Sequence, residues 1–314
     1  MKIVMTDIDG STLCPKNITH LTMTDTADAA CSSVALKFKD KERIGEINSV
    51  KVYDGDKAVF CGFCDCQRVT ADGDGFECYI YARSSACLLV DSQAKPFTFN
   101  CPSARQLWCE YAKALGFSYS LPEYYCKEKY EISSGTSCFG AINNFVTALS
   151  GSEIYINAQN ELCLRQESQD IKSLSKYDII SASSVINRSE PISKISFRRE
   201  QDNGYNAHME SGFVIDKGIS RERFVNLNSV ASWQRDNTVY RRLKGYTQSY
   251  MLLEVTVAGH IDEELYQRYS FHGDIGDFDD YILTEKKYTF DGSRERTRLT
   301  LRKSIDIGDV MYVD

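Results

Sequence analysis

The apolar positions of this chain follow two different periods. From residue 1 to about 95, and again over most of residues 177–314, apolar and polar positions tend to alternate, as in strands with one buried face. In the middle of the chain they recur every three or four residues, the spacing of a helix with one apolar stripe. The pattern predicts a mainly β fold in which two β-barrel-like domains, residues 1–95 and 177–314, flank an α+β insert with two helices, residues 96–176.

The clearest predicted helix runs from Ser103 to Gly116. Ser103 and Gln106 have the spacing of a capping box, and Gly116 suits the left-handed conformation that ends many helices. Its predicted apolar stripe consists of Ala104, Leu107, Trp108, Tyr111, Ala112 and Leu115. We expect this stripe to face the core of the insert, with Trp108 as its anchor.

A second stripe predicts a helix over roughly Ser137 to Ser150, ending at Gly151. Short strands are predicted at Tyr130–Ser133, Glu153–Asn157 and Leu162–Arg165, the last two forming a pair. The insert is therefore expected to be a small α+β module.

Three turn signals divide the first β region into antiparallel strands. Asp9-Gly10 predicts a first hairpin that closes near Leu21–Thr24, and Asp54-Gly55 and Asp72–Gly75 predict two more. Successive strands joined by Asp-Gly turns are typical of a meander that curls into a sandwich or barrel.

The last region also predicts strands, at Ile192–Arg199, Leu252–Gly259, Asp280–Thr284 and Arg296–Lys303. Asn226–Gly245 is polar and weakly periodic, so it is predicted to be a long loop with one helical turn.

Composition narrows the class of protein. The chain of 314 residues is 42% hydrophobic and 26% charged, as in soluble globular proteins. No apolar run reaches the length needed to cross a bilayer, and an acidic residue interrupts the N-terminus too early for a secretory signal, so a cytoplasmic product is expected. The net charge of -7 argues against specific nucleic-acid binding. We expect the many late arginines on solvated strand faces and at protein interfaces.

The twelve cysteines all lie between Cys14 and Cys163 and are expected to be reduced thiols. The tightest group is Cys61, Cys64 and Cys66. A structural zinc site needs a second ligand pair, which the later cysteines do not supply at a matching spacing, so we expect no metal here. On a regular strand, Cys64 and Cys66 would share one face as small apolar residues.

The stretch Ile3–Ser11 contains Asp7 and Asp9 and resembles the first motif of the haloacid-dehalogenase-type phosphatases. That resemblance implies a nucleophilic Asp7 and a general acid Asp9 in a magnesium-dependent phosphohydrolase. Asp274 and Asp279 resemble the family's late magnesium-binding carboxylates. This is the alternative function for the chain.

Two features weigh against the phosphatase interpretation. The family needs a parallel sheet with a crossover helix after each strand, and no such alternation is visible. Ser11 also stands where the family has Thr or Val. A turn between two strands explains Asp9-Gly10 without catalysis.

The remaining candidate motifs are incomplete. Asp72–Glu77 resembles half of a calcium loop, but Arg83 stands where the bidentate Glu is required. His20, His208, His260 and His272 are scattered without metal-ligand or triad spacing. We assign no catalytic, cofactor-binding or metal site, and we expect no enzyme activity and no cofactor.

Residues 50–117 carry a further resemblance. A strand pair ending in Phe60-Cys-Gly-Phe63 is followed by a strand that leads to Ala82-Arg-Ser-Ser, then by Leu88-Leu-Val-Asp, and then by the helix that closes at Gly116. This order resembles the baseplate hub proteins of contractile-tailed bacteriophages, prophage tails and phage-tail-like bacteriocins. The resemblance is firmest over residues 33–150.

The resemblance implies a homotrimer with two similar barrel domains in each chain, so that six units match the hexameric tail tube on one side and three chains match the trimeric central spike on the other. It implies these partners, together with other baseplate and tape-measure proteins. It also implies assembly in the bacterial host cytoplasm and a final location in the virion tail baseplate. Such a protein is structural and has no catalytic site.

Overall fold

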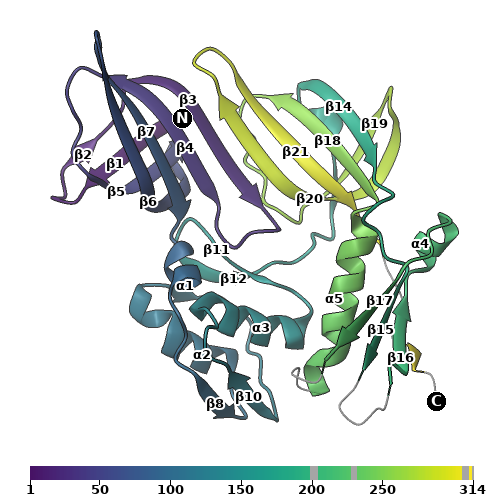
Figure 1. Ribbon diagram of the computed structural model, residues 1–314. Coiled ribbons are helices and arrows are strands. Elements are labelled where there is room, and N and C mark those ends of the chain that lie inside the picture. Colours follow the sequence, from purple (N-terminus) through teal and green to yellow (C-terminus); the bar gives the residue numbers. More distant parts are fainter. Residues whose placement is uncertain (199–203, 228–231, 306–310, 313–314) are drawn as a thin grey trace.

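A computed structural model describes residues 1–198, 204–227, 232–305 and 311–312. Its main feature is one mixed sheet of 13 strands in the order β14-β18-β21-β20-β3-β4-β7-β6-β5-β1-β2, with β19 pairing β20 and β13 pairing β19. The strands of the first region are β1 (Lys2–Asp7), β2 (Thr12–Leu13), β3 (Asn17–Thr26), β4 (Ser33–Asp40), β5 (Ile47–Asp54), β6 (Lys57–Asp72) and β7 (Gly75–Ser84). They form the purple and blue group in Figure 1.

The first β region folds around its own core because its strands alternate apolar and polar residues. In β4, Val34, Leu36 and Phe38 are fully buried, whereas Lys37 and Lys39 between and beside them are exposed. Ile80 and Ala82 of β7 lie opposite Leu36 and Val34 in the same core. One face of the sheet is therefore packed and the other faces solvent.

The second β region has a separate core built in the same way. Its strands are β13 (Ile171–Ser173), β14 (Ile179–Ile186), β18 (Met251–Ala258), β19 (Arg268–Gly273), β20 (Gly276–Phe290) and β21 (Glu295–Lys303). Leu299 and Leu301 of β21 are fully buried among Val255 and Leu283. The two regions join where β20 pairs β3, from Glu285 opposite Thr26 to Phe290 opposite Leu21.

This junction makes the two β regions one continuous sheet (Figure 1). The main strand order ends at β14 on one side and at β1 and β2 on the other, and a branch from β20 ends at β13, so no closed barrel is found among the described strands. The expected mainly β fold with a small helical module is confirmed, and the β regions are open curled sheets.

All three predicted turns form, but the first hairpin has a different partner strand from the one predicted. Asp54 pairs Lys57 and Asp72 pairs Gly75, as the turn signals predict. The strand β1, however, turns back into the two-residue strand β2 and also pairs β5. The predicted partner segment, Leu21–Thr24, lies in β3 and pairs β20 and β4 instead. Strand β3 therefore forms a hairpin with the next strand, β4, and its other side pairs the distant β20.

The insert contains the predicted helices. Its elements up to residue 164 are β8 (Phe97–Asn100), α2 (Ala104–Tyr111), β9 (Ser118–Tyr119), β10 (Lys129–Ile132), α3 (Cys138–Ser150), β11 (Ile154–Ile156) and β12 (Glu161–Leu164), and the short helix α1 (Cys87–Asp91) lies just before it. At the start of α2 the Ser103 side chain accepts a hydrogen bond from the Gln106 N–H, and Gln106 Oε1 accepts one from the Ser103 N–H, which confirms the capping box. Gly116 is left-handed, with φ of 87°.

The predicted stripe of the first helix is only partly correct. The α-helix ends at Tyr111 and continues as a 3₁₀ turn over Lys113–Leu115. A 3₁₀ turn has three residues per turn, so Leu115 rotates off the stripe and is 38% exposed. Leu107 is fully buried, whereas Trp108 is half-buried at the edge of the core and donates its indole N–H to the Phe117 carbonyl at 2.9 Å.

The second predicted helix is confirmed as α3. Ser137 caps its first turn, since its side chain accepts the Gly140 N–H, and the left-handed Gly151 ends it. Ile142, Phe145 and Val146 are fully buried against α2 and β10. No helix among the described ranges has both the length and the apolar character needed to cross a membrane.

The predicted loop at Asn226–Gly245, of which residues 228–231 lie outside the described residues, is wrong over most of its length, because a helix of 14 residues, α5 (Arg235–Gln248), occupies it. The helix covers a second small sheet, and together they form a second α+β module. The other elements of this module are β15 (Lys194–Arg198), β16 (Ala207–Glu210), α4 (Gly212–Asp216), β17 (Glu222–Asn226) and β22 (Met311–Tyr312). The buried residues of α5 are Arg235, Val239, Leu243 and Thr247, which form a narrow stripe with an interval of four residues. Its other faces are polar, which hides the helical period.

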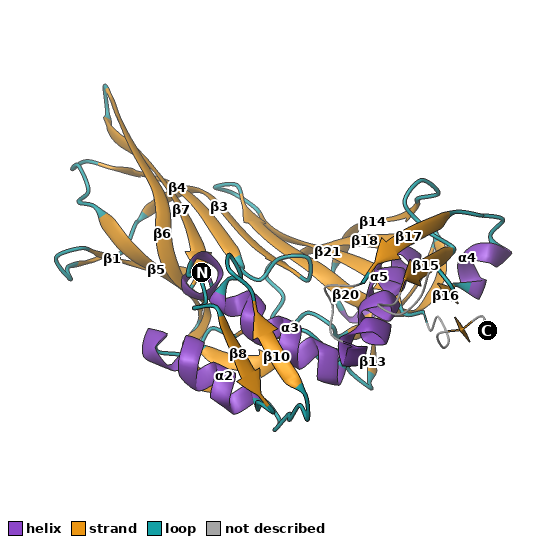
Figure 2. Ribbon diagram, turned by 60° about the horizontal axis from the view of Figure 1, so that its bottom comes forward, coloured by secondary structure: helices purple, strands orange, loops and turns teal. Residues whose placement is uncertain are grey.

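The two modules lie beside each other on one side of the sheet. Figure 2 shows α2, α3 and α5 together below the long strands. The strand β14 leads into the second module and β18 leads out of it. The molecule therefore has a layer of strands and a layer of two α+β modules.

Candidate functional site

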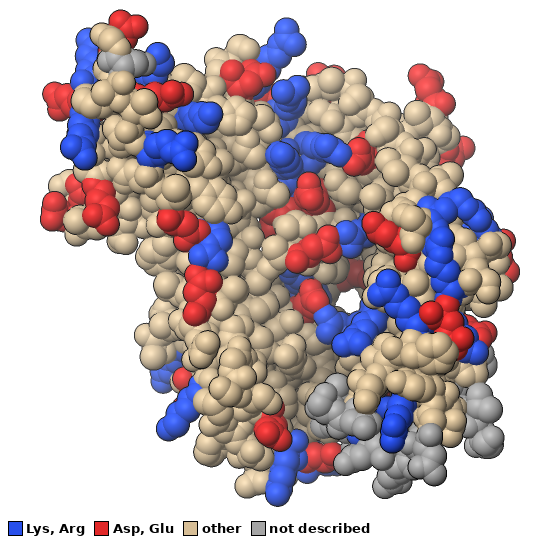
Figure 3. All heavy atoms as spheres, in the orientation of Figure 1, with Lys and Arg blue, Asp and Glu red and all other residues tan. Residues whose placement is uncertain are grey.

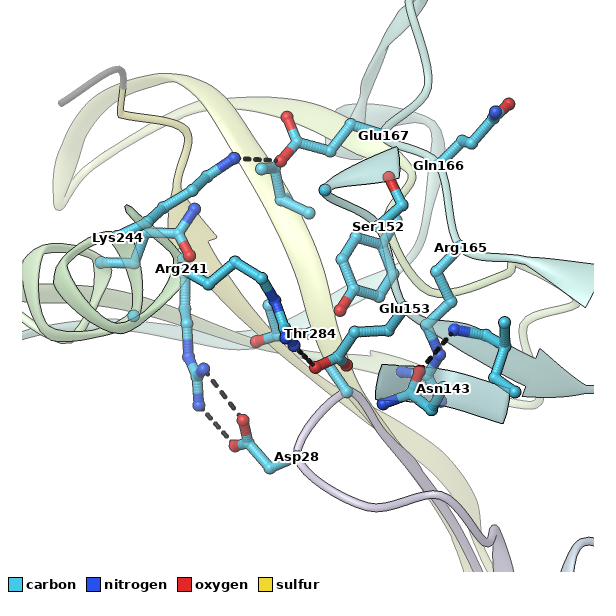
Figure 4. A pocket seen from close by; sticks show the side chains of 18 of the residues that line it. Asp28, Asn143, Ser152, Glu153, Arg165, Gln166, Glu167, Arg241, Lys244 and Thr284 are labelled. Atoms are coloured by element: carbon cyan, nitrogen blue, oxygen red, sulfur yellow. Dashed lines mark hydrogen bonds and ion pairs between the residues drawn. The ribbon is translucent and has the colours of Figure 1, made fainter. Parts of the chain in front are cut away.

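A cavity of about 910 Å³ lies where the insert, the helix α5 and the sheet meet. Its charged lining residues are Asp28, Glu153, Arg165, Glu167, Arg241, Lys244 and Arg302. Figure 3 shows a hollow near the centre of this face with both kinds of charge at its rim, and Figure 4 shows the lining from close by. The lining of the cavity is polar, and its residues come from parts of the chain that are far apart in sequence.

Each carboxylate of the lining is paired with a cation from another element. Lys244 of α5 binds Glu167 at 2.8 Å, and Arg241 of the same helix binds Glu153 of the insert. Arg302, at the end of β21, holds Asp28 in the β3–β4 loop through two hydrogen bonds of 3.1 and 2.6 Å. Glu153 and Glu167 therefore hold α5 to the insert, and Asp28 holds the β3–β4 loop to β21 (Figure 4).

One face of α5 contacts the insert. Asn237 donates to the Ala148 carbonyl at 2.6 Å, and Arg241 and Lys244 follow at the next turns of the helix. The spacing i, i+4 and i+7 places these three side chains in one row. Sequence reasoning missed this site because the segment was predicted to be a loop, although the same spacing was visible in the sequence.

Arg165 is the most deeply buried cation of the lining, with 9% of its surface exposed. Its guanidinium lies 5.7 and 5.6 Å from the ring centres of Tyr155 and Tyr266. It also donates to the carbonyls of Thr26 and Ala29 at 3.5 and 3.4 Å. Burial raises the pKa of Tyr266. Arg165 thus fastens the insert to the β3–β4 loop.

The structure places Asp7 and Asp9 in a turn between antiparallel strands. The Asp7 carboxylate accepts the N–H groups of Asp9 and Ser11 at 3.0 and 2.7 Å, and Gly10 has φ of 84°. The phosphatase motif requires a parallel strand followed by a crossover helix, so the fold around Asp7 differs from that of the family.

The late carboxylates do not complete a site with Asp7. Asp274 lies in the β19–β20 hairpin, and the strands β20, β3, β4, β7, β6 and β5 separate β19 from β1. Within the described ranges, no group of three or more His, Cys, Asp or Glu side chains is arranged to hold a metal ion.

The cysteine cluster differs from the prediction in one respect. A β-bulge between Cys64 and Cys66 shifts the register, so Cys64 lies opposite Ala82 and Cys66 opposite Tyr81. Since adjacent residues of β7 face opposite sides, the two cysteines do not share a face. Cys66 is exposed, and burial raises the pKa of Cys64.

The four histidines lie on different elements, and three of them lie near carboxylates, His208 being 3.8 Å from Glu210. His260 Nδ1 lies 2.9 Å from Asp54, and burial lowers the pKa of His260 despite that partner. His272 lies 3.0 Å from Asp277 at an exposed hairpin. The calcium-like segment forms the β6–β7 hairpin.

A second polar cluster, also missed from the sequence, holds the segment after β18. Glu263 is bound by Lys172 at 2.7 Å, Lys176 at 2.8 Å and the Tyr177 hydroxyl at 2.6 Å. Burial alone would raise the pKa of Glu263, but these three donors hold it at about 2. The cluster ties β13 and the start of β14 to the second core.

Strand β14 forms an open edge of the sheet. Among the described strands it exposes the most large apolar side chains. Ile180 and Ile186 are 59% and 57% exposed, and the strand carries no charged residue. Among the described strands, β14 pairs only β18. Natural proteins protect such an edge, so this one is a candidate assembly surface.

Comparison with solved structures finds the same fold in tail proteins. A tail protein from Neisseria meningitidis MC58 matches with a TM-score of 0.76 at 15% identity over 96% of each chain. The 43 kDa tail protein of prophage MuSo2 from Shewanella oneidensis matches with a TM-score of 0.76 at 14% identity, over 96% of this chain and 97% of that one. The E. coli c3393 protein, a component of the type VI secretion system, matches with a TM-score of 0.58 at 8% identity, over 94% of this chain and 76% of that one.

No family model and no curated protein matches the sequence, so the similarity is one of structure. It includes both β regions and both α+β modules, because it spans nearly the whole of the first two chains. The chain has the fold of phage and prophage tail proteins.

Proposed function

We propose that this protein is a structural baseplate hub protein of a contractile phage tail or a related injection particle. In this proposal three copies form a ring that joins the hexameric tail tube to the trimeric central spike. The fold it shares with tail proteins over almost its entire length supports a role in the tail.

The observation that carries the ring is the continuous sheet, in which the two ends of the main strand order are unlike open edges, β14 at one end and β1 with β2 at the other, besides the short branch that ends at β13. Unlike edges favour head-to-tail contact between copies, and a head-to-tail interface that closes makes a ring without free edges. Two β regions per chain give six similar units in a trimer, which suits a hexameric tube. The exposed isoleucines of β14 suit burial in such a contact.

The proposed partners are a second and third copy of the chain, the tail tube protein, the central spike protein, and other baseplate and tape-measure proteins. The proposed location is the tail baseplate of the particle, after assembly in the bacterial host cytoplasm. We also propose the division at residues 95 and 176 as the domain organisation, with the second α+β module inserted into the last domain between β14 and β18.

The oligomeric state tests the ring directly. Light scattering after size exclusion should give three times the chain mass of 35.6 kDa, alone or with the spike protein present. Ile180→Lys should abolish the trimer because it puts a charge on the pairing edge, whereas Ile215→Lys, at an exposed position of α4, should not. A wild-type monomer under both conditions would contradict the proposal.

The proposed role is not enzymatic, and the alternative with Asp7 and Asp9 is tested separately. We expect no hydrolysis of a generic phosphomonoester with magnesium present. Activity that Asp7→Asn removes would restore the phosphohydrolase interpretation.

A further inference from the structure

The lining of the cavity of about 910 Å³ contains one positive charge that no acid of the lining neutralises. Four cations and three acids line this cavity, and they are Arg165, Arg241, Lys244, Arg302, Asp28, Glu153 and Glu167. Each of the three acids is bound by a different cation, and these cations are Arg241, Lys244 and Arg302. The fourth cation, Arg165, forms no ion pair with any residue that the structure describes.

The surroundings of Arg165 do not replace an acidic partner. Its guanidinium donates to the carbonyls of Thr26 and Ala29 at 3.5 and 3.4 Å, which is longer than the usual range of about 2.7 to 3.2 Å. The rings of Tyr155 and Tyr266 attract the cation but carry no net negative charge. Arg165 is 9% exposed, and a buried charge without a counterion is unfavourable. An anion beside it in the cavity would therefore be stabilised.

Arg165 also lines a neighbouring cavity of about 360 Å³, whose acids have partners or face water. The other charged residues of that lining are Asp25, Lys57, Asp262, Glu263, Glu264 and Lys286. Lysines bind Asp262 and Glu263, and Asp25 lies opposite Lys286 in the pairing of β3 with β20. Glu264 is exposed, so water weakens the attraction between its charge and Arg165. The neighbouring cavity therefore supplies no close counterion to Arg165.

Asn143 adds a neutral donor to the same part of the lining. Its Oδ1 accepts the Ile154 N–H at 2.9 Å, which orients the amide, and its NH₂ group has no acceptor among the described residues. The Arg165 N–H donates to the Glu153 carbonyl at 2.7 Å. Asn143 and Arg165 are thus both attached to the start of β11, and both line the large cavity (Figure 4).

The donor set and the charge of this site match a carboxylate. The planar fork of an arginine fits the two oxygens of a carboxylate, and an amide NH₂ group can donate to one of them as well. One unneutralised cation matches one negative charge. A phosphate dianion would bring a second negative charge to a lining that already contains three carboxylates.

We propose that Arg165, with Asn143 beside it, binds the carboxylate group of a ligand in the cavity of about 910 Å³. Two sources offer this group, a free organic acid and an acidic side chain of another polypeptide that enters the cavity from the open face in Figure 3. The site lies within one chain, so the inference goes beyond the proposed function and does not depend on the ring.

The test is thermal melting of the full chain with added probes at constant ionic strength. The probes are sodium propionate, a peptide with blocked ends and a single Glu among glycines, the same peptide with Gln, and sodium phosphate. Arg165→Lys keeps the charge but loses the planar fork, and Arg165→Gln loses both. The matched control is Arg43→Gln, which removes an arginine from an exposed position of the β4–β5 loop. Arg165→Lys alone carries the comparison if Arg165→Gln does not fold.

The melting temperature of the wild type and of Arg43→Gln should rise with the concentration of a carboxylate probe, as linkage to a single site requires. The Arg165 variants should bind that probe roughly tenfold more weakly or worse. A rise with propionate assigns the site to a free acid, and a rise with the Glu peptide but not with propionate assigns it to a polypeptide.

Three results would overturn the proposal. They are no rise with either carboxylate probe, an equal rise in the Arg165 variants, and a rise with phosphate or the Gln peptide that equals the rise with the carboxylates. The mass of the protein in solution is measured separately, so failure of this site and failure of the ring are distinguishable.

Discussion

The Lys57 ammonium lies 2.6 Å from the Asp262 carboxylate, so the β5–β6 hairpin of the first β region is tied to a loop of the second, 205 residues later. His260 in that loop also binds Asp54 of the same hairpin. The two β regions therefore touch at a second place besides the β20–β3 pairing, and their relative orientation is set by both.

The Lys57–Asp262 pair should contribute little free energy of unfolding despite its position. Both side chains are at least half exposed, and exposed ion pairs are worth at most about 1 kcal/mol. Lys57→Ala should therefore shift chemical denaturation only slightly. A loss of several kcal/mol would show that the hairpin depends on this contact.

Leu107 and Leu115 offer a matched pair on either side of the helix end. Leu107→Ala should cost about 2 to 5 kcal/mol because it opens a cavity in the core of the insert. Leu115→Ala should cost less than about 0.5 kcal/mol, because the side chain is already exposed. Urea denaturation of both variants measures the difference, and equal costs would contradict the boundary of α2.

The row of side chains on α5 should make the junction of the two modules sensitive to salt. Arg241→Ala combined with Lys244→Ala removes both ion pairs to the insert, and hydrogen exchange in α5 and α3 should then rise. High salt should produce a weaker form of the same change in the wild type. Arg242→Ala, on the neighbouring face of α5, is the control, and an equal effect of that variant would argue against the row.

Glu263 should make the protein less stable in acid. Its pKa lies at about 2, below the ordinary 4.5, so the folded state favours the charged form. The stability it contributes is present above about pH 4.5 and is lost as the pH falls from there towards 2. Glu263→Gln should therefore be less stable than the wild type at neutral pH, and the gap should narrow through this window.

The control for that titration is Glu264→Gln, at the exposed neighbouring position. Thermal melts of the three proteins at several pH values give the comparison. A gap between wild type and Glu263→Gln that stays constant from pH 6 to pH 2 would contradict the assignment.

The cysteines should divide by reactivity. Cys14, Cys66, Cys101 and Cys109 are exposed and should react first with a thiol reagent, whereas Cys78, Cys87, Cys126 and Cys138 are buried and should react only on unfolding. We also expect no stoichiometric zinc in the purified protein, since the bulge separates Cys64 from Cys66. Zinc at one equivalent per chain would refute the second expectation.

The sequence by itself determined the local elements whose signals lie within a few residues. The capping box at Ser103, the glycines at the ends of the two insert helices and the turns after Asp54 and Asp72 all form as predicted. Backbone conformation and short-range hydrogen bonds fix such features, so the signal and the structure lie in the same stretch.

Only the tertiary structure decided which elements meet. Strand β3 pairs β20 because apolar faces from distant parts of the chain are buried together. The sequence around β3 does not indicate which strand becomes its partner. The sequence pattern did not predict helix α5, because its contacts with the insert are polar and a row of polar residues produces no apolar stripe.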